Sequence, residues 1–223
     1  MPRPRSDIQP RLLRAARDRF LREGVDGASL RNIARDAGTS VGMLYYYFPT
    51  KDDLFFAVVE ERYGKLLADL AEAFVPTHSP AERLRSMYRR VGRMGDDDLM
   101  VVKLVIREAL LSSARLQRLV ERFMRGHLPL ILGTLVDGVR DGSLRADLPP
   151  PVLFIATMAL GMATQLARRA VGTQAFLAGA PEGETLADAA LEVLLHGVAA
   201  PEGRLSEGPP TPDGARGGGG RAR

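Results

Sequence analysis

The sequence predicts an all-helical protein. Apolar residues recur at intervals of three and four along the 223-residue chain, and no segment alternates apolar and polar residues as a half-buried strand does. Gly, Pro, Ser and Thr separate the apolar stretches at points suited to helix ends. Three short helices and a connecting helix are predicted over about the first 70 residues, and long helices after Pro76 to Pro80.

The first 50 residues predict three helices that pack together. Residues 7–23 carry apolar side chains on one face with arginines between them, and Gly24 supplies a C-terminal stop. Residues 30–37 and 41–48 predict two helices of about two turns, which are marginal unless they pack against the first. Pro49 ends the third helix because proline disfavours helical geometry in the residue before it.

Longer helices follow. Thr50 is a suitable N-cap for a fourth helix over residues 50–74, because aspartates stand in its positively polarised first turn. The remaining apolar stripes predict helices over residues 80–94, 97–111, 115–140, 150–170 and 185–199. Pro129 cannot donate a hydrogen bond to the carbonyl of Arg125, so the helix over 115–140 is expected to kink beside Gly126.

Positive charge is concentrated near the N-terminus. Residues 1–51 contain ten Arg and Lys residues against five acids, a net charge of +5, whereas the whole chain carries +4. This distribution favours an anionic partner held at one end of the molecule, with nucleic acid ahead of a membrane surface. On charge alone, a solvated arginine-rich helix face is the alternative.

Composition and motifs argue against several classes of protein. The chain has no cysteine, which excludes disulfides and thiolate sites and favours the cytoplasm. No apolar run follows the early arginines, so no secretory signal is expected. Residues 152–167 are too short for a membrane span of ~20 residues, and a buried helix is expected there, with no membrane partner.

No catalytic chemistry is predicted. The chain has no phosphate-binding loop and no nucleophile motif, and its three histidines lack metal-ligand spacing: His78, His127 and His196. We therefore expect no enzyme, no catalytic residue, no cofactor and no metal.

Residues 37–40, Ala-Gly-Thr-Ser, have the composition of the tight turn in a helix-turn-helix. On a helical wheel, Leu44 and Phe48 share the face expected to be buried, whereas Tyr46 lies on the opposite side. The row of aromatic residues at 45–48 therefore divides into an anchor and tyrosines that point toward a partner.

A recognition helix reads base edges with its N-terminal residues and sets its register through phosphates. Val41 and Met43 offer apolar contact to thymine methyl groups, Gly42 permits close approach, and the Arg31 fork matches guanine or phosphate. The alternative is that the tyrosines only cover a hydrophobic surface. The predicted contacts with double-stranded DNA are made by Ser29, Arg31, Thr39, Ser40, Val41, Gly42, Met43, Tyr45, Tyr46, Tyr47 and Lys51.

Residues 29–55, SLRNIARDAGTSVGMLYYYFPTKDDLF, resemble the DNA-binding signature of the tetracycline-repressor (TetR) family. The matching positions are Ile33, Ala34, Ala37, Gly38, Ser40, Gly42, Leu44, Tyr45, Tyr47, Phe48, Lys51 and Leu54. Thr39 stands where the family usually has valine, a mild departure that makes the turn more polar. The resemblance covers residues 7–60, and beyond them only the number and lengths of the helices agree.

The resemblance implies a homodimeric transcriptional regulator, most often a repressor that leaves its operator when a small ligand binds. By position it implies phosphate contacts for Tyr45, Tyr47 and Lys51. It implies base or groove contacts for Arg31, Val41, Gly42, Met43 and Tyr46. The rival hypothesis is a helical small-molecule-binding or interaction protein that keeps the fold without operator recognition.

The apolar helix over residues 152–167 predicts a subunit interface. A helix without a polar face must be covered on two sides, and the same helix of a second subunit would provide the second cover in a two-fold, four-helix interface. The central helix of a monomeric bundle is the alternative. The predicted interface residues are Ala156, Ala159, Ala163, Leu186, Ala190, Val193, Leu194 and Gly197.

A few polar residues interrupt the apolar helices and predict a pocket for a moderately hydrophobic organic effector. The predicted lining residues are Met100, Arg107, Glu108, Phe123, His127 and Gln165. For each polar residue taken singly, a hydrogen-bonded group of the core is the alternative.

These observations divide the chain into three regions. Residues 1–52 are expected to form a helix-turn-helix DNA-binding domain, and residues 53–200 a helical domain for ligand binding and dimerisation. Residues 201–223 are rich in Gly, Pro and Arg and cannot bury enough apolar surface to fold, so a disordered tail is expected.

Overall fold

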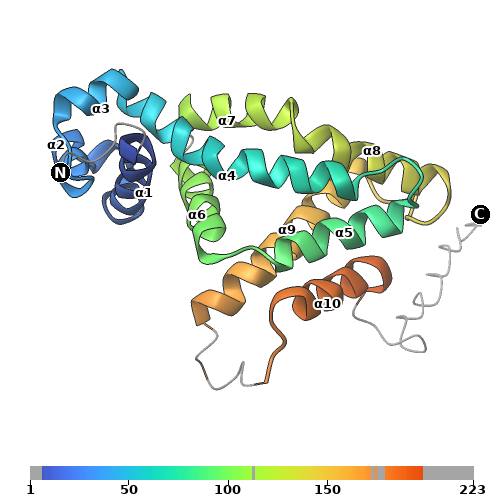
Figure 1. The fold of residues 1–223 in the computed structure, drawn as a ribbon. Coiled ribbons are helices and arrows are strands. Elements are labelled where there is room, and N and C mark those ends of the chain that lie inside the picture. The colour runs from blue at the N-terminus through green and yellow to red at the C-terminus, as the bar shows by residue number, and fades with distance from the viewer. Residues whose placement is uncertain (1–6, 112–113, 172–173, 175–178, 198–223) are drawn as a thin grey trace, which may run out of the picture.

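The computed structural model of the chain is an assembly of helices (Figure 1). It describes residues 7–111, 114–171, 174 and 179–197, and no β-strand occurs within these ranges. The predicted tail therefore lies outside the described residues. The helices are α1 (Ile8–Gly27), α2 (Leu30–Asp36), α3 (Val41–Tyr47), α4 (Lys51–Ala73), α5 (Pro80–Gly92), α6 (Asp96–Leu111), α7 (Ala114–Met124), α8 (His127–Arg140), α9 (Pro150–Val171) and α10 (Gly183–His196).

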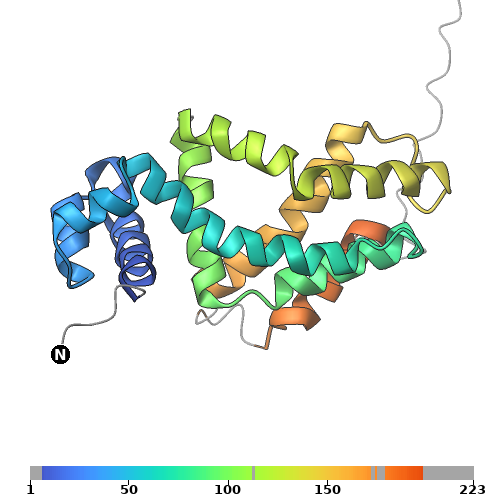
Figure 2. The same ribbon diagram turned by 45° about the horizontal axis from the view of Figure 1, so that its top comes forward.

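Helices α1 to α3 form a unit at one end of the molecule, and α4 runs from this unit along the larger C-terminal part (Figures 1 and 2). The first hydrophobic core joins α1 to α3 with the first half of α4 and with residues of α6 and α7. The second core joins the end of α4 with α5, α8, α9 and α10. The predicted all-helical fold is confirmed, but the predicted order of short helices before long ones is not: α1 has 20 residues, whereas α5 has 13 and α7 has 11.

Helix α4 belongs to both cores. Phe55 and Tyr63 are buried in the first core, Leu70 is buried in the second, and Leu66 packs against both. The helix begins at a capping box in which Thr50 accepts a hydrogen bond from the backbone of Asp53, and Asp53 accepts one from the backbone of Thr50. Thr50 is therefore the cap that the sequence predicts.

The sequence predicts that the first helix ends at Gly24, but in the structure it kinks at this residue and continues to Gly27. Gly24 has φ 77° and ψ 165°, a conformation that favours glycine, and one further helical turn follows it to Gly27. Arg107 of α6 lies against this kink: a Cβ atom on Gly24 would stand 2.7 Å from its guanidinium. The kink thus allows α6 to pack closely against the end of α1.

The predicted helix over residues 115–140 is two helices, so the expectation of one kinked helix needs correction. The break falls at Gly126, as predicted, and its cause includes a tertiary contact as well as Pro129. The hydroxyl of Tyr63 accepts a hydrogen bond from the backbone N–H of His127 at 3.2 Å, which satisfies one free donor at the start of α8. A side chain on Gly126 would collide with that hydroxyl.

Helices α5 and α10 pack closely along their length. Arg89 and Arg93 of α5 form paired hydrogen bonds with Asp188 and Glu184 of α10, at 2.7 to 3.2 Å. At the end of α5, a Cβ atom on Gly92 would lie 2.6 Å from the backbone oxygen of Gly183. Backbone atoms cannot rotate away, so this contact requires glycine.

We predict that Gly92→Ala destabilises the protein by about 1–3 kcal/mol, because the added methyl group forces α5 away from α10. Chemical denaturation followed by circular dichroism measures the free energy of unfolding. Gly95→Ala is the matched control, since a Cβ atom at Gly95 meets nothing within 4 Å. Equal stability of the two variants would show that the α5–α10 contact is not close.

Candidate functional site

The turn between α2 and α3 is held by α1. Arg11 of α1 donates hydrogen bonds from one guanidinium nitrogen to the carbonyls of Ala37 at 2.5 Å and Gly38 at 3.3 Å. Gly38 has φ 63°, the left-handed conformation that this turn needs. Ser40 accepts a hydrogen bond from the backbone of Met43 at 3.2 Å and is the N-cap of α3.

Helix α3 presents one face to the core and the other to solvent. Leu44 and Phe48 are buried, as the helical wheel predicts. Tyr45 is 50% exposed and Tyr46 is 77% exposed, although large aromatic side chains usually gain stability by burial. Tyr47 is half-buried, and its ring lies edge-on to that of Tyr46 with 5.3 Å between centroids.

The predicted DNA-contacting residues lie in α2, in α3, at the N-caps of these helices, in the turn between them and at the first residue of α4. Ser29, Arg31, Ser40 and Gly42 are exposed. The half-buried members are Thr39, Val41, Met43, Tyr47 and Lys51.

Lys51 is tied to the end of α1. Its ammonium group donates a hydrogen bond to the carbonyl of Asp26 at 2.8 Å. The carboxylate of Asp26 accepts two hydrogen bonds from Arg115 of α7, both at 2.8 Å. Arg115 also bonds Asp52 at 3.1 Å and Glu108 at 2.9 Å, so one guanidinium connects the ends of α1, α4, α6 and α7. Burial disfavours the charge on Arg115, but the bonds to these acids outweigh that effect and raise its pKa.

Additional arginines lie beside the helix-turn-helix, and their individual positions were not predicted from the sequence. They line a polar groove of about 430 Å³ between α1 and α2, together with the acids Asp18 and Asp36. Arg19 donates to Asp36 at 2.7 Å and lowers the pKa of that carboxyl group. In the sequence, the only indication of this groove is the net positive charge of residues 1–51. The arginines are Arg11, Arg14, Arg22 and Arg35.

A largely apolar cavity of about 360 Å³ lies between α4, α6, α7 and α9, with residues at the ends of α5 and α8 also contributing. Its apolar lining residues are Val59, Leu66, Met94, Val101, Val102, Val105, Ile106, Phe123, Met158 and Met162. Its polar lining residues are Arg62, Tyr63, Arg90, Asp98 and His127. An apolar wall with few polar groups suits a small organic molecule. In the part of the chain that the structure describes, no cluster of His, Cys, Asp or Glu could hold a metal ion.

The structure brings two of the six predicted pocket residues, Phe123 and His127, to this cavity. The other four lie elsewhere. Arg107 lies against α1, the buried Glu108 bonds Arg115, and Met100 of α6 is absent from the lining. Gln165 is buried and donates to the carbonyl of Gly183 at 2.9 Å. Where these four side chains lie depends on which helix packs against each face of α6 and α9. Hydrophobic periodicity identifies a buried face but not the helix that covers it.

Tyr63 and His127 form the polar centre of the cavity wall. The Tyr63 hydroxyl oxygen lies 2.9 Å from Nδ1 of His127 and already accepts the His127 backbone N–H. The hydroxyl and Nδ1 share a hydrogen bond, and the tautomer of the ring sets which of them donates. Burial, with a smaller effect of the Arg122 charge, lowers the pKa of His127 from 6.5 to about 4.

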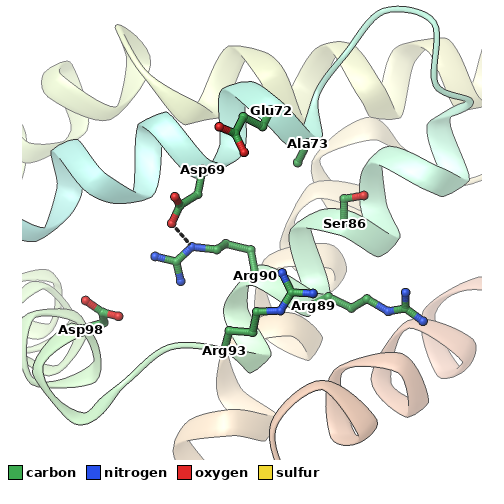
Figure 3. Close-up of a pocket in the computed structure, with 8 residues that line it drawn as sticks. All are labelled: Asp69, Glu72, Ala73, Ser86, Arg89, Arg90, Arg93 and Asp98. Carbon is green, nitrogen blue, oxygen red and sulfur yellow. Dashed lines mark hydrogen bonds and ion pairs between the residues drawn. The ribbon is translucent and has the colours of Figure 1, made fainter.

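A polar groove of about 520 Å³ adjoins the cavity and shares Arg90 and Asp98 with it (Figure 3). Arg90 of α5 points across the groove and pairs with Asp69 of α4. Asp98 comes from the first turns of α6 on the other side. The apolar cavity thus has charged residues along one border.

The predicted interface residues lie on α9 and α10. On α9, the buried positions recur every fourth residue, at Leu153, Thr157, Gly161 and Gln165. The opposite face is exposed and apolar, with Ile155 64% exposed. The expectation that this apolar stretch is buried and too short to span a membrane needs correction: it belongs to the 22-residue α9, which by length and composition could cross a membrane, and 22% of its most apolar window is buried. Of the predicted interface residues, Ala159, Ala163, Val193 and Gly197 are exposed and Ala156, Leu186 and Leu194 are half-buried.

Ala190 requires a correction. It is only 5% exposed and belongs to the second core, because α10 turns Ala187, Ala190 and Leu191 toward its own chain. A buried residue of this kind is unavailable to a partner subunit.

We predict that acid weakens the fold through His127. Its pKa is about 4 in the folded protein and 6.5 when unperturbed, so the unfolded chain binds more protons between these pH values. The free energy of unfolding should fall as pH falls from 6.5 to 4, by at most about 3 kcal/mol from this group. His127→Asn should reduce that slope, and His78→Asn, at an exposed site, is the control. Identical slopes for all three proteins in urea denaturation would exclude His127 as the group responsible.

Comparison with known proteins agrees with these features. Residues 12–58 match the family model described as bacterial regulatory proteins, tetR family. The fatty acid metabolism regulator protein of Bacillus subtilis is 24% identical over 140 residues, which cover 61% of this chain and 71% of that protein. A transcriptional repressor of Mycobacterium tuberculosis, Rv3405c, is 28% identical over 140 residues, 63% of either chain.

The fold also matches solved structures. The crystal structure of the transcriptional regulator FadR from Bacillus subtilis, in complex with stearoyl-CoA, superposes with a TM-score of 0.68. The match covers 85% of this chain and 98% of that one at 20% identity. A TetR-like transcriptional regulator from Rhodococcus sp. RHA1 is 27% identical, with a TM-score of 0.62 over 86% of this chain and 95% of that one. The helix-turn-helix, the helical C-terminal part and these relatives lead to one conclusion: residues 12–58 carry the DNA-binding domain of bacterial regulatory proteins of the tetR family, and the chain is similar over most of its length to transcriptional regulators of that family.

Proposed function

We propose that this regulator is a cytoplasmic repressor that binds a near-palindromic operator as a homodimer and leaves it when a small hydrophobic ligand binds. The exposure of Tyr45 and Tyr46 beside the buried anchors Leu44 and Phe48 is the observation that carries the proposal. An aromatic face held rigidly in solvent is suited to a partner surface.

On the DNA side, each predicted residue has a proposed role. The N-terminal residues Val41, Gly42 and Met43 of α3 would face base edges, together with Tyr46 and the exposed Arg31. Tyr45, Tyr47 and Lys51 would contact phosphates. Ser29, Thr39 and Ser40 would add hydroxyl contacts at the start of each short helix. Lys51 is already held near the surface by the carbonyl of Asp26.

The second subunit would cover the exposed apolar face of α9. Ala159 and Ala163 are small, so two copies of this helix could approach closely, and Val193 and Gly197 of α10 extend the same kind of surface. Covering this face would remove exposed apolar area from water, which favours association. A two-fold dimer would place two recognition helices about 34–36 Å apart, one turn of DNA.

The ligand would occupy the apolar cavity between α4, α6, α7 and α9. Three methionines in its wall can adapt to different ligand shapes: Met94, Met158 and Met162. The crystallised FadR of Bacillus subtilis holds stearoyl-CoA, which supports an apolar chain as the ligand of this chain too.

Helix α4 would couple the two activities. We propose residues 1–52 as the DNA-binding domain and residues 53–200 as the ligand-binding and dimerisation domain, with α4 crossing the boundary. Val59, Tyr63 and Leu66 line the cavity, whereas Leu54 and Phe55 pack against α1 to α3. A ligand that displaces α4 would change the spacing of the two recognition helices, with a coupling of ~1–3 kcal/mol.

We predict that selection from a random DNA pool with the purified protein enriches a near-palindromic sequence. Affinity for that duplex should fall steeply with salt, because arginines and lysines displace ions from phosphates. Fluorescence anisotropy at several salt concentrations measures this slope. Failure to enrich any sequence at low salt would contradict operator binding and support a ligand-binding protein that keeps only the fold.

We predict different losses for residues that read bases and residues that hold phosphates. Tyr45→Phe and Lys51→Ala should weaken binding to all duplexes about equally, and Lys51→Ala should lower the salt slope by about 1. Arg31→Ala should cost about 1–3 kcal/mol and relax the preference at one base pair. Competition among single-base variants of the selected duplex provides the measurement. A uniform loss for Arg31→Ala would remove it as a base-reading residue.

A further inference from the structure

A single carboxylate joins the DNA-binding unit to the wall of the cavity. Asp97, in the first turn of α6, bonds Arg17 of α1 at 3.0 Å and also pairs with Arg62 of α4. We call Arg17, Asp97 and Arg62 the three-helix bridge.

Arg17 depends strongly on this bridge. It is 7% exposed, and two of its guanidinium nitrogens, Nε and Nη1, have no hydrogen-bond partner among the described residues. Its only other ion pair among those residues is with Asp18, whose carboxylate lies 3.9 Å away. A buried charge that loses its partner is strongly destabilising, so the position of α1 relative to α6 is sensitive to Asp97.

Arg62 pairs with Asp97 and also faces the cavity. It lines the cavity, and its buried Nε has no hydrogen-bond partner among the described residues. The cavity lining contains two guanidinium groups, Arg62 and Arg90, and one carboxylate, Asp98. Arg62 pairs with Asp97 and lies 3.9 Å from Asp98, and Arg90 pairs with Asp69, so the unpartnered Nε of Arg62 is the donor that an anionic group on a ligand would meet.

We propose that the cavity binds an amphipathic molecule, an apolar chain ending in a carboxylate or a phosphate, and that this anionic group takes Arg62 away from Asp97. The proposal rests on the ligand-responsive function proposed above and names the ligand class and the contact that it changes. The apolar chain would lie against Val105, Phe123 and the methionines. With Arg62 turned to the ligand, Asp97 and Asp98 of α6 lose their ion pairs with α4, and Asp97 retains Arg17 alone.

The bridge then provides a direct route from ligand to DNA. Arg17 lies in α1, which holds the turn before α3 through Arg11. Loosening α6 from α4 frees α1 and the recognition helix to move relative to the cavity. Typical couplings between two sites correspond to changes in affinity of about 5–150-fold.

The first test compares three probes that share one chain: decanoate, decyl phosphate and decanol. Calorimetry measures their binding to the full-length protein. We expect decanoate or decyl phosphate to bind at least about 10-fold more tightly than decanol, since charge-assisted hydrogen bonds are the stronger ones. Which of the two anions binds better separates a fatty acid from a phosphate-bearing ligand. Arg62→Gln should remove the preference over decanol. Equal binding of all three probes, or no binding, would overturn the anionic-ligand assignment.

The second test uses Asp97→Asn, with Asp96→Asn as the matched control. Asp96 is the preceding residue, its side chain is 90% exposed, and it reaches Arg169 only at 3.5 Å. Asp97→Asn should weaken operator binding in the absence of ligand by about 5–150-fold and respond little to decanoate, while still binding it. Asp96→Asn should behave as wild type.

Identical operator affinity and decanoate response in both variants would overturn the three-helix bridge as the transmitting contact. If Asp97→Asn does not fold, Arg62→Gln is read instead, and it should bind operator weakly with no response to decanoate. If wild-type protein binds no operator at all, the proposed function fails, whereas the three-probe comparison still decides the ligand class.

Discussion

The position of the recognition helix relative to the cavity depends on α4, because this helix is buried in both hydrophobic cores. Its first half packs against α1, with the rings of Phe20 and Phe55 edge-on at 6.2 Å, and its second half ends in the core around Leu84 and Tyr88. Tyr63 lies between these two halves and forms part of the cavity wall. A rigid helix of 23 residues cannot shift at one end without disturbing the other.

Polar contacts at the junction between the two cores set orientation more than stability. Arg115 bonds three acids from three elements, and Asp97 bonds two arginines. Partly buried ion pairs lose much of their attraction to the cost of desolvation, so their net contribution to stability is small. Removing one partner is costly, however, and this asymmetry makes such contacts suitable for a junction with two arrangements.

Two consecutive helices, α7 and α8, separate at Gly126, beside the cavity wall formed by Phe123 and His127. Tyr63, Phe123 and His127 form an aromatic cluster there, with ring centroids 5.0 to 5.5 Å apart. The glycine leaves room for the Tyr63 hydroxyl, and that hydroxyl satisfies the first N–H of α8. The break between α7 and α8, the capping of α8 and the polar wall of the cavity thus involve the same three residues: Tyr63, Gly126 and His127.

Most of the helices, the cap at Thr50, and the burial of Leu44 and Phe48 follow from the sequence by itself. Helical periodicity and capping are local properties, and they identify which residues leave solvent. The break at Gly126 also follows, because Pro129 and glycine act on their own segment. The amino-acid order alone therefore identifies the face of α3 that carries the predicted DNA contacts.

Only the tertiary structure decided which buried faces meet. Periodicity shows that Glu108 and Gln165 are polar residues within apolar helices, but it does not identify their partners. These are Arg115 and the carbonyl of Gly183, which lie 7 and 18 residues away in the sequence. Arg62, Asp98 and Arg90 look like ordinary surface charges in the sequence, and they reach the cavity only when α4, α5 and α6 converge. The periodicity of apolar residues predicts which face of a helix is buried, whereas the packing of the helices determines which residues cover that face. Ligand sites between helices depend on this packing.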